Sequence, residues 1–155
     1  MIEERSAGAV VYHQGEGAQY LLLLYPASHW DFPKGNVEAG EDDVDTVKRE
    51  VEEETGIRDI LLDKGFESSV EYYYHRAGEG MVHKRVNFYL AHTETREVRL
   101  SHEHRDFAWF PLEEALKRLT YDNSRRVLSE AADHLKSTTV TSSLDEYLQQ
   151  HPPDR

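Results

Sequence analysis

The chain of 155 residues has 30 acidic and 18 basic residues, a formal net charge of −12, and 38% hydrophobic residues. This length and composition are typical of one folded domain with its own core, and they exclude an intrinsically disordered chain. The negative charge argues against general nucleic-acid binding. The absence of cysteine excludes disulfide scaffolds and thiolate sites. The longest apolar run, Tyr20–Tyr25, is too short for a membrane helix.

The first half of the chain predicts a hairpin, a loop and a helix. The β-prone runs Ala7–His13 and Gln19–Tyr25 are separated by the turn-like segment Gly15–Ala18. After a loop that ends near Glu41, residues 42–55 have helical periodicity, and Gly56 provides a stop signal. The spacing i, i+3, i+7 predicts a core-facing stripe made of Val44, Val47 and Val51.

The second half predicts three strands and two helices. Strands are expected near Gly65–His75, Met81–Thr93 and Asp106–Phe110. Helices are expected over Pro111–Leu119 and over Asn123–Lys136, with Asn123 as the N-cap. Ser143 and Glu146 have capping-box spacing, which predicts a further short helix in a C-terminal extension, 137–155. Helices packed on a mixed sheet place the chain, 1–155, in the α/β class as a single domain, for which we expect a cytoplasmic location and favour a monomer.

Three carboxylates share one turn of the predicted helix. Glu50, Glu53 and Glu54 lie at i, i+3 and i+4, where their like charges repel each other. A bound hard cation such as Mg²⁺, or Mn²⁺, relieves this repulsion and takes further oxygen ligands from substrate phosphates. Arg49, four residues before Glu53, is positioned to hold its carboxylate. The alternative is a solvated acidic face of an acidic protein.

The residues around this triad carry a family resemblance. Gly35, Glu41 six positions later, and the run Arg49–Ile57 resemble the signature of the Nudix hydrolases. The resemblance implies an α/β/α sandwich with a mixed central sheet and the hydrolysis of a nucleoside diphosphate linked to another group, with Mg²⁺ or Mn²⁺. It also implies roles for single residues. Glu50 and Glu54 are the implied metal ligands, the backbone near Gly35 is a further ligand, and Glu53, oriented by Arg49, is a ligand or the general base.

Three further stretches narrow the resemblance. The segment HWDFPKGNVEAGEDD, the strand VHKRVNFYLA and the segment RLSHEHRDFAWFPLEEA resemble the animal and archaeal type of diadenosine tetraphosphate hydrolase. This resemblance implies asymmetric cleavage of the dinucleotide to ATP and AMP. It implies phosphate contacts by Lys34, Lys84 and His29, base stacking by Tyr74 and Tyr121, and a role for Glu103 as an additional metal ligand or alternative general base.

Several alternatives stay open at this point. The same chemistry serves other nucleoside diphosphate derivatives, including oxidised nucleotides, ADP-ribose and diphosphoinositol polyphosphates, and a nucleotide-sensing module binds without turnover. The lysines have a second interpretation as solvated surface residues, and His29 as a capping or core residue. The run Tyr72–Tyr74, in which Tyr72 and Tyr74 are expected on one face, has a second interpretation as ordinary strand residues. His102 and His104 hint at zinc, but their i, i+2 spacing has no third soft ligand.

Overall fold

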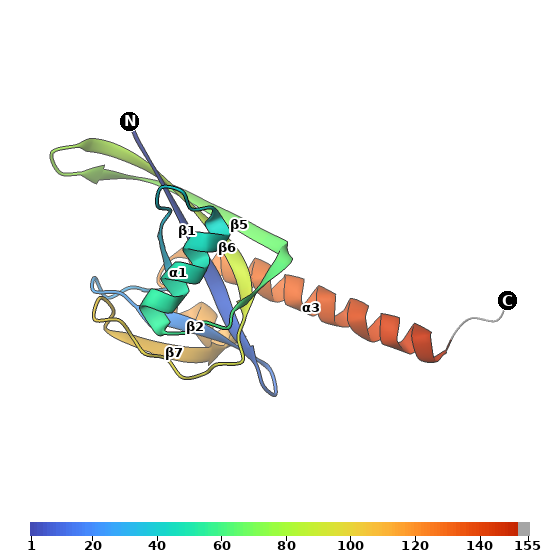
Figure 1. Ribbon diagram of the computed structural model, residues 1–155. Coiled ribbons are helices and arrows are strands. Elements are labelled where there is room, and N and C mark those ends of the chain that lie inside the picture. The colour runs from blue at the N-terminus through green and yellow to red at the C-terminus, as the bar shows by residue number, and fades with distance from the viewer. Residues whose placement is uncertain (152–155) are drawn as a thin grey trace.

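A seven-stranded mixed sheet forms the centre of the molecule (Figure 1). The structure is a computed structural model that describes residues 1–151, apart from the side chains of residues 139–146. The path β3-β2-β1-β6-β5 is extended by β4, which pairs with β1, and by β7, which pairs with β2. The strands are β1 (Ile2–Gln14), β2 (Ala18–Leu24), β3 (Trp30–Asp31), β4 (Lys34–Asn36), β5 (Leu61–Arg76), β6 (Gly80–His92) and β7 (Asp106–Pro111).

The strand pairing confirms the predicted N-terminal hairpin and the mixed sheet. Strands β1 and β2 are antiparallel, with Tyr12 opposite Tyr20, whereas β1 runs parallel to β6. Strand β1 begins at Ile2 rather than at Ala7, because its ladder with β6 starts at that residue. Strands β5 and β6 form a long antiparallel hairpin that extends beyond the rest of the sheet in Figure 1.

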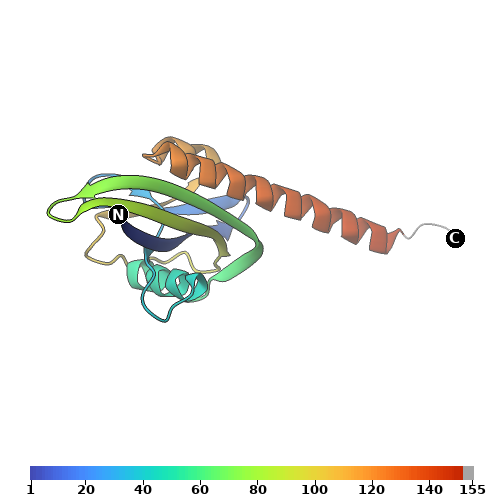
Figure 2. The same cartoon turned by 90° about the horizontal axis from the view of Figure 1, so that it is seen from above.

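Three helices cover the two faces of the sheet: α1 (Asp43–Thr55), α2 (Leu112–Arg118) and α3 (Asp122–Gln150). Helix α1 lies on one side of the sheet, and α2 with the first part of α3 lies on the other (Figure 2). Each side has its own buried cluster. Val47 and Val51 of α1 join one, and Val127 and Leu128 of α3 join the other. This arrangement confirms the predicted α/β/α sandwich.

Helix α1 has a defined beginning and end. The Asp42 side chain accepts a hydrogen bond from the Asp45 backbone N–H at 2.8 Å, and Asp45 returns the contact, which completes a capping box. Gly56 ends the helix in the left-handed conformation, with φ of 77°. The predicted core stripe was wrong at its first position. Val44 is 39% exposed, because the first turn of α1 meets the sheet through Asp43, whose carboxylate binds the Tyr89 hydroxyl at 2.6 Å.

Two further expectations need correction. The predicted loop before α1 contains the short strands β3 and β4, and β4 adds to the edge of β1. The helix expected to end at Lys136 continues to Gln150, because the sequence between these residues contains neither proline nor glycine. This helix begins after Tyr121 rather than at Asn123. The side chains of Ser143 and Glu146, the predicted capping box, lie outside the described residues.

The second half of α3 extends away from the sheet in both views (Figures 1 and 2). Its exposed side chains include Tyr147 and Leu148. No helix within the described residues is long and apolar enough to cross a membrane.

Candidate active site

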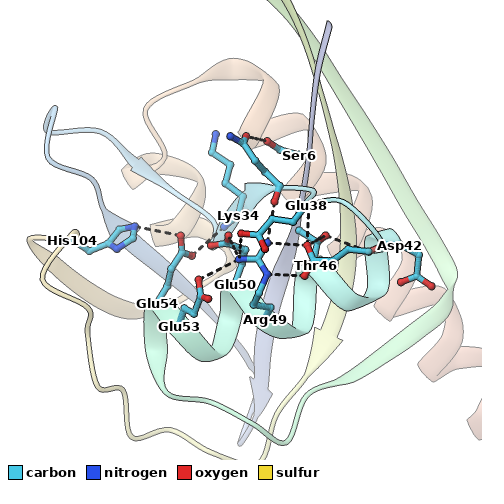
Figure 3. Close-up of polar contacts among 12 residues, drawn as sticks. Ser6, Lys34, Glu38, Asp42, Thr46, Arg49, Glu50, Glu53, Glu54 and His104 are labelled. Carbon is cyan, nitrogen blue, oxygen red and sulfur yellow. Dashed lines mark hydrogen bonds and ion pairs between the residues drawn. The ribbon is translucent and has the colours of Figure 1, made fainter.

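Helix α1 and the loop before β7 enclose a small acidic cavity of about 170 Å³. The helix contributes the three predicted carboxylates, which extend from one face of α1 in Figure 3. The loop adds Glu103, so the structure brings this predicted residue to the triad from a distant part of the sequence. The residues that line the cavity are Glu50, Glu53, Glu54, Ser101, His102 and Glu103.

Arg49 connects the carboxylates of this helix to the loop before it (Figure 3). Its Nη1 donates to Glu53 at 3.2 Å, which is the contact predicted from the sequence, and to Glu50 at 2.7 Å. The bidentate partner is Glu41, whose two oxygens accept from Nε at 2.7 Å and from Nη2 at 2.9 Å. Hydrogen bonds from Arg49 lower the pKa of Glu41 to about 2. Arg49 therefore holds the helix and the preceding loop in one arrangement.

Gly35 lies in β4 directly against Glu50. A Cβ atom at this position would lie 2.0 Å from Glu50 Cδ and 2.1 Å from Oε1. Glycine is therefore required for the Glu50 carboxylate to occupy its place beside the β4 backbone. This contact gives a physical reason for the first glycine of the sequence signature.

Burial and mutual repulsion disfavour the ionised form of the carboxylates in this cavity. Burial raises the pKa of Glu54 to about 9, and the neighbouring Glu50 and Glu103 carboxylates add to the shift. Burial also raises the pKa of Glu50, despite its contact with Arg49. A cation bound among these groups reverses both effects, because it favours the ionised carboxylates.

The donor set fits a hard divalent cation, although the carboxylates are not arranged around one. Among the side chains that the structure describes, no group of three or more His, Asp or Glu residues forms a ready-made metal site. Glu50 and Glu53 both turn toward Arg49. The fit rests on the chemistry of the cavity. Several carboxylates, which repel each other, line it, and the Glu50 carboxylate lies directly against the backbone at Gly35, so oxygen ligands of the kind that a hard cation prefers are close together.

Glu54 contacts two other parts of the site. Its Oε2 accepts a hydrogen bond from the Lys34 backbone N–H at 3.1 Å, and its Oε1 lies 3.7 Å from His104 Nε2. Burial lowers the pKa of His104, so the ring is neutral at pH 7. His102 lines the cavity whereas His104 is buried behind it. The two histidines therefore differ in environment and do not form the zinc pair that their spacing suggested.

A second cavity, of about 440 Å³, adjoins the first through Lys34, since the backbone of this residue binds Glu54 while its side chain lines the second cavity. Lys34 Nζ lies 3.1 Å from Asp31 Oδ2. Burial opposes the charge of Lys34, but Asp31 together with Tyr72 and Tyr121 outweighs burial and raises the pKa of the ammonium group. His29 stacks on Tyr25 with ring centroids 4.8 Å apart and lies 5.5 Å from Tyr121. Three predicted residues, Lys34, His29 and Tyr121, thus line one cavity.

Tyr72 was missed by the sequence analysis, although it lines the second cavity. Tyr74 lies next to it on the same face of β5, with ring centroids 6.2 Å apart, as alternation along a strand requires. The Tyr74 hydroxyl donates to Glu4 at 3.0 Å, and Tyr74 does not line the cavity. A run of three tyrosines identifies the face that carries two of them, but it does not identify which one meets the cavity.

Lys84 stands opposite Tyr72 in the ladder between β5 and β6. Its ammonium group lies 2.8 Å from Glu4 Oε1 and 3.3 Å from Asn36 Oδ1. This places it beside β4, one residue from Gly35, but outside the lining of both cavities. The role of Lys84 in binding phosphate therefore remains a prediction.

Comparison with known proteins decides the family. The sequence model of the NUDIX domain matches residues 3–131. The chain belongs to the Nudix family. It is 36% identical over 121 residues to an asymmetrical bis(5'-nucleosyl)-tetraphosphatase of Caenorhabditis elegans, covering 76% of this chain and 86% of that protein. The mouse protein of the same name is 35% identical over 147 residues, which cover 86% of this chain and 97% of the mouse protein.

A solved structure agrees with the sequence relatives. The crystal structure of a binary complex of C. elegans Ap4A hydrolase superposes with a TM-score of 0.76 at 31% identity, covering 86% of this chain and 98% of that one. The chain is therefore a Nudix hydrolase, a class that acts on small nucleotide substrates, and the acidic cavity lies on its signature helix.

Proposed function

We propose that this Nudix hydrolase cleaves dinucleoside tetraphosphates asymmetrically, converting diadenosine tetraphosphate to ATP and AMP. The observation that carries the proposal is the adjacency of the two cavities. One is lined by carboxylates, and the other is lined by aromatic rings and the partly buried side chain of Lys34, whose backbone N–H binds Glu54 of the first cavity. Relatives at 34–37% identity that bear the name asymmetrical bis(5'-nucleosyl)-tetraphosphatase support this choice of substrate.

We propose Mg²⁺ as the cofactor, with Mn²⁺ as a substitute. Glu50 and Glu54 would be the main ligands, with Glu53, Glu103 and the backbone carbonyl of Gly35 as the further candidates. When bound, the cation supplies charge neutralisation at the phosphates and acidifies the attacking water. The raised pKa values of Glu50 and Glu54 support this assignment, because a cation compensates the buried negative charge that causes them.

Glu53 is the proposed general base. Its side chain is 59% exposed, whereas those of Glu50 and Glu54 are 14% and 8% exposed, so Glu53 has the best access to solvent water within the triad. Arg49 donates to its carboxylate at 3.2 Å and thereby limits its orientation. Glu103, on the opposite wall of the cavity, is the alternative base. In this scheme Glu53 removes a proton from water as the water attacks a terminal phosphorus of the chain. The bond from this phosphorus to the bridging oxygen breaks, so AMP carries the new P–O bond and ATP departs as the leaving group.

Substrate binding is assigned to the second cavity and to Lys84 and Tyr74, which lie outside its lining. Lys34 stays protonated beside Asp31 and would hold a phosphate of the chain, with His29 and Lys84 as further donors. Tyr121 would stack on an adenine, and Tyr74, predicted from the sequence, shares this assignment with its neighbour Tyr72. Stacking on an aromatic ring contributes about 1–3 kcal/mol per base.

The test is incubation with diadenosine tetraphosphate and Mg²⁺, followed by chromatography of the products. Equal amounts of ATP and AMP are the expected result. Two molecules of ADP would keep the substrate but overturn the asymmetric position of attack. No cleavage of this dinucleotide, with turnover of ADP-ribose or an oxidised nucleoside triphosphate in the same panel, would contradict the proposed substrate while leaving the hydrolase in place. Binding without turnover of any substrate would favour a sensing module.

A monomer in the cytoplasm remains our proposal for the state of the protein. A chain without cysteine is compatible with a reducing compartment. Light scattering coupled to size-exclusion chromatography measures the mass directly, and a dimer mass would contradict the proposal.

A further inference from the structure

His104 is buried beside the acidic cavity without lining it. Its side chain is only 3% exposed. The loop that carries it is fixed at both ends: the Ser101 N–H donates to the Glu54 carbonyl at 3.1 Å, and the Arg105 N–H donates to the Leu24 carbonyl at 2.8 Å. The Tyr25 ring packs edge-on against the imidazole, with centroids 4.5 Å apart. The ring therefore has a set position relative to the end of α1.

The two ring nitrogens face different partners. Nδ1 lies 3.1 Å from Ser101 Oγ, while Nε2 points at Glu54 Oε1 from 3.7 Å (Figure 3). Nε2 is fully buried and has no hydrogen-bond partner among the residues that the structure describes. When a bound cation keeps the Glu54 carboxylate ionised, this carboxylate only accepts hydrogen bonds, so the contact then needs the proton on Nε2, and the Ser101 hydroxyl donates to Nδ1. A movement of roughly 0.8 Å brings Nε2 and Oε1 to hydrogen-bond distance.

We propose that His104 is a positioning residue for Glu54. Its Nε2–H holds Oε1, the Lys34 backbone N–H holds Oε2, and together they fix the plane of the carboxylate that serves the divalent cation. This inference rests on the cation site proposed above. The proposal gives the buried Nε2 of His104 a function. A hydrogen bond to a metal-binding carboxylate orients that carboxylate and raises its affinity for the ion.

Two substitutions at His104 separate donation from packing. His104→Phe keeps a flat ring and removes the donor, whereas His104→Gln keeps an N–H near the position of Nε2. The matched control is His134→Phe. His134 lies on α3, outside both cavities, and its Nε2 also faces a carboxylate, at 3.0 Å from Asp63 Oδ2. Each variant is measured for Mn²⁺ affinity by electron paramagnetic resonance without nucleotide, and for kcat and KM with diadenosine tetraphosphate.

The expected result is a 10–100-fold loss of Mn²⁺ affinity or kcat in His104→Phe. His104→Gln should recover most of the loss, KM at saturating metal should change little, and His134→Phe should match the wild type. Equal impairment of the Phe and Gln variants would overturn the proposal, because it would assign the effect to ring volume. Wild-type Mn²⁺ affinity and kcat in a folded His104→Phe variant would overturn it as well.

A measurement on the wild-type protein keeps the proposal testable if His104→Phe does not fold. With saturating Mg²⁺, which keeps Glu54 ionised, nitrogen-15 NMR of the histidine rings should show His104 as the Nε2–H tautomer, and an Nδ1–H tautomer under these conditions would refute the proposal. The outcomes also separate this inference from the proposed substrate. A wild-type protein that binds Mn²⁺ and does not cleave the dinucleotide contradicts the substrate alone, whereas one that binds no Mn²⁺ contradicts the cation site and the role of His104 together.

Discussion

Replacing Gly35 by alanine should strongly lower the activity of the enzyme without unfolding it. The added Cβ atom would lie 2.0 Å from Glu50 Cδ and 2.5 Å from Oε2, so the carboxylate has to leave its position. The atoms that must move form the far end of a flexible side chain, and the backbone of β4 keeps its pairing with β1. The perturbation therefore acts on one proposed metal ligand and leaves the sheet intact.

The distance sets the size of the effect. Non-bonded carbon atoms approach to about 3.5 Å, so Glu50 Cδ must be displaced by roughly 1.5 Å. A misplacement of about 1 Å in a catalytic group costs about 10²-fold in rate. We therefore expect kcat/KM to fall at least about 10²-fold, which is about 2.7 kcal/mol of transition-state stabilisation. The free energy of unfolding should change by less than about 1 kcal/mol.

Steady-state kinetics and urea unfolding of Gly35→Ala test both halves of this prediction. Gly15→Ala is the matched control, because a Cβ there meets nothing within 4 Å, and it should leave activity unchanged. Gly8→Ala is the opposite case, since its Cβ would lie 2.6 Å from the rigid backbone oxygen of Pro33, and it should lower stability. Wild-type kcat/KM in a folded Gly35→Ala variant would refute the proposed link between Gly35, Glu50 and the cation.

Two further predictions concern charged groups. Glu53→Gln should lower kcat by about 10²–10⁴-fold with little change in KM; a variant that keeps a tenth of the wild-type rate would direct attention to Glu103 as the base. Hydrogen bonds from Lys84 and Arg76 lower the pKa of Glu4 from 4.5 to about 2. Its contribution to stability is complete above pH 4.5 and is lost as the pH falls toward 2. Glu4→Gln should therefore flatten the pH dependence of the free energy of unfolding between these values, and identical curves for the two proteins in urea would contradict this.

Local signals predicted the signature helix well. The helical periodicity and the stop signal at Gly56 are properties of a single short segment, and α1 covers Asp43–Thr55, close to the expected range 42–55. The grouping of Glu50, Glu53 and Glu54 follows from helix geometry alone. The addition of Glu103 to this group came from the family resemblance, because no local pattern connects residues some 50 positions apart.

Long-range packing accounts for what sequence reasoning missed. Val44 was assigned to the core by its spacing, yet the first turn of α1 meets the sheet through a polar side chain. Strand β4 has three residues and forms only because β1 offers an edge. His104 has no local feature that reports burial, and Tyr72 differs from Tyr74 only in its distance from a cavity built by other elements.

The parallel ladder between β1 and β6 has a consequence for how the chain folds. Each residue of β1 from Ile2 to Tyr12 pairs with a residue 80 positions later, whereas β5 and β6 are joined by a short turn. Closing such a long loop costs chain entropy before any contact compensates it. We expect the β5–β6 hairpin to form early and the β1–β6 ladder to limit the refolding rate. During synthesis the edge of β1 that faces β6 therefore stays unpaired until residues 82–92 have left the ribosome, although β2 and β4 can pair with β1 earlier.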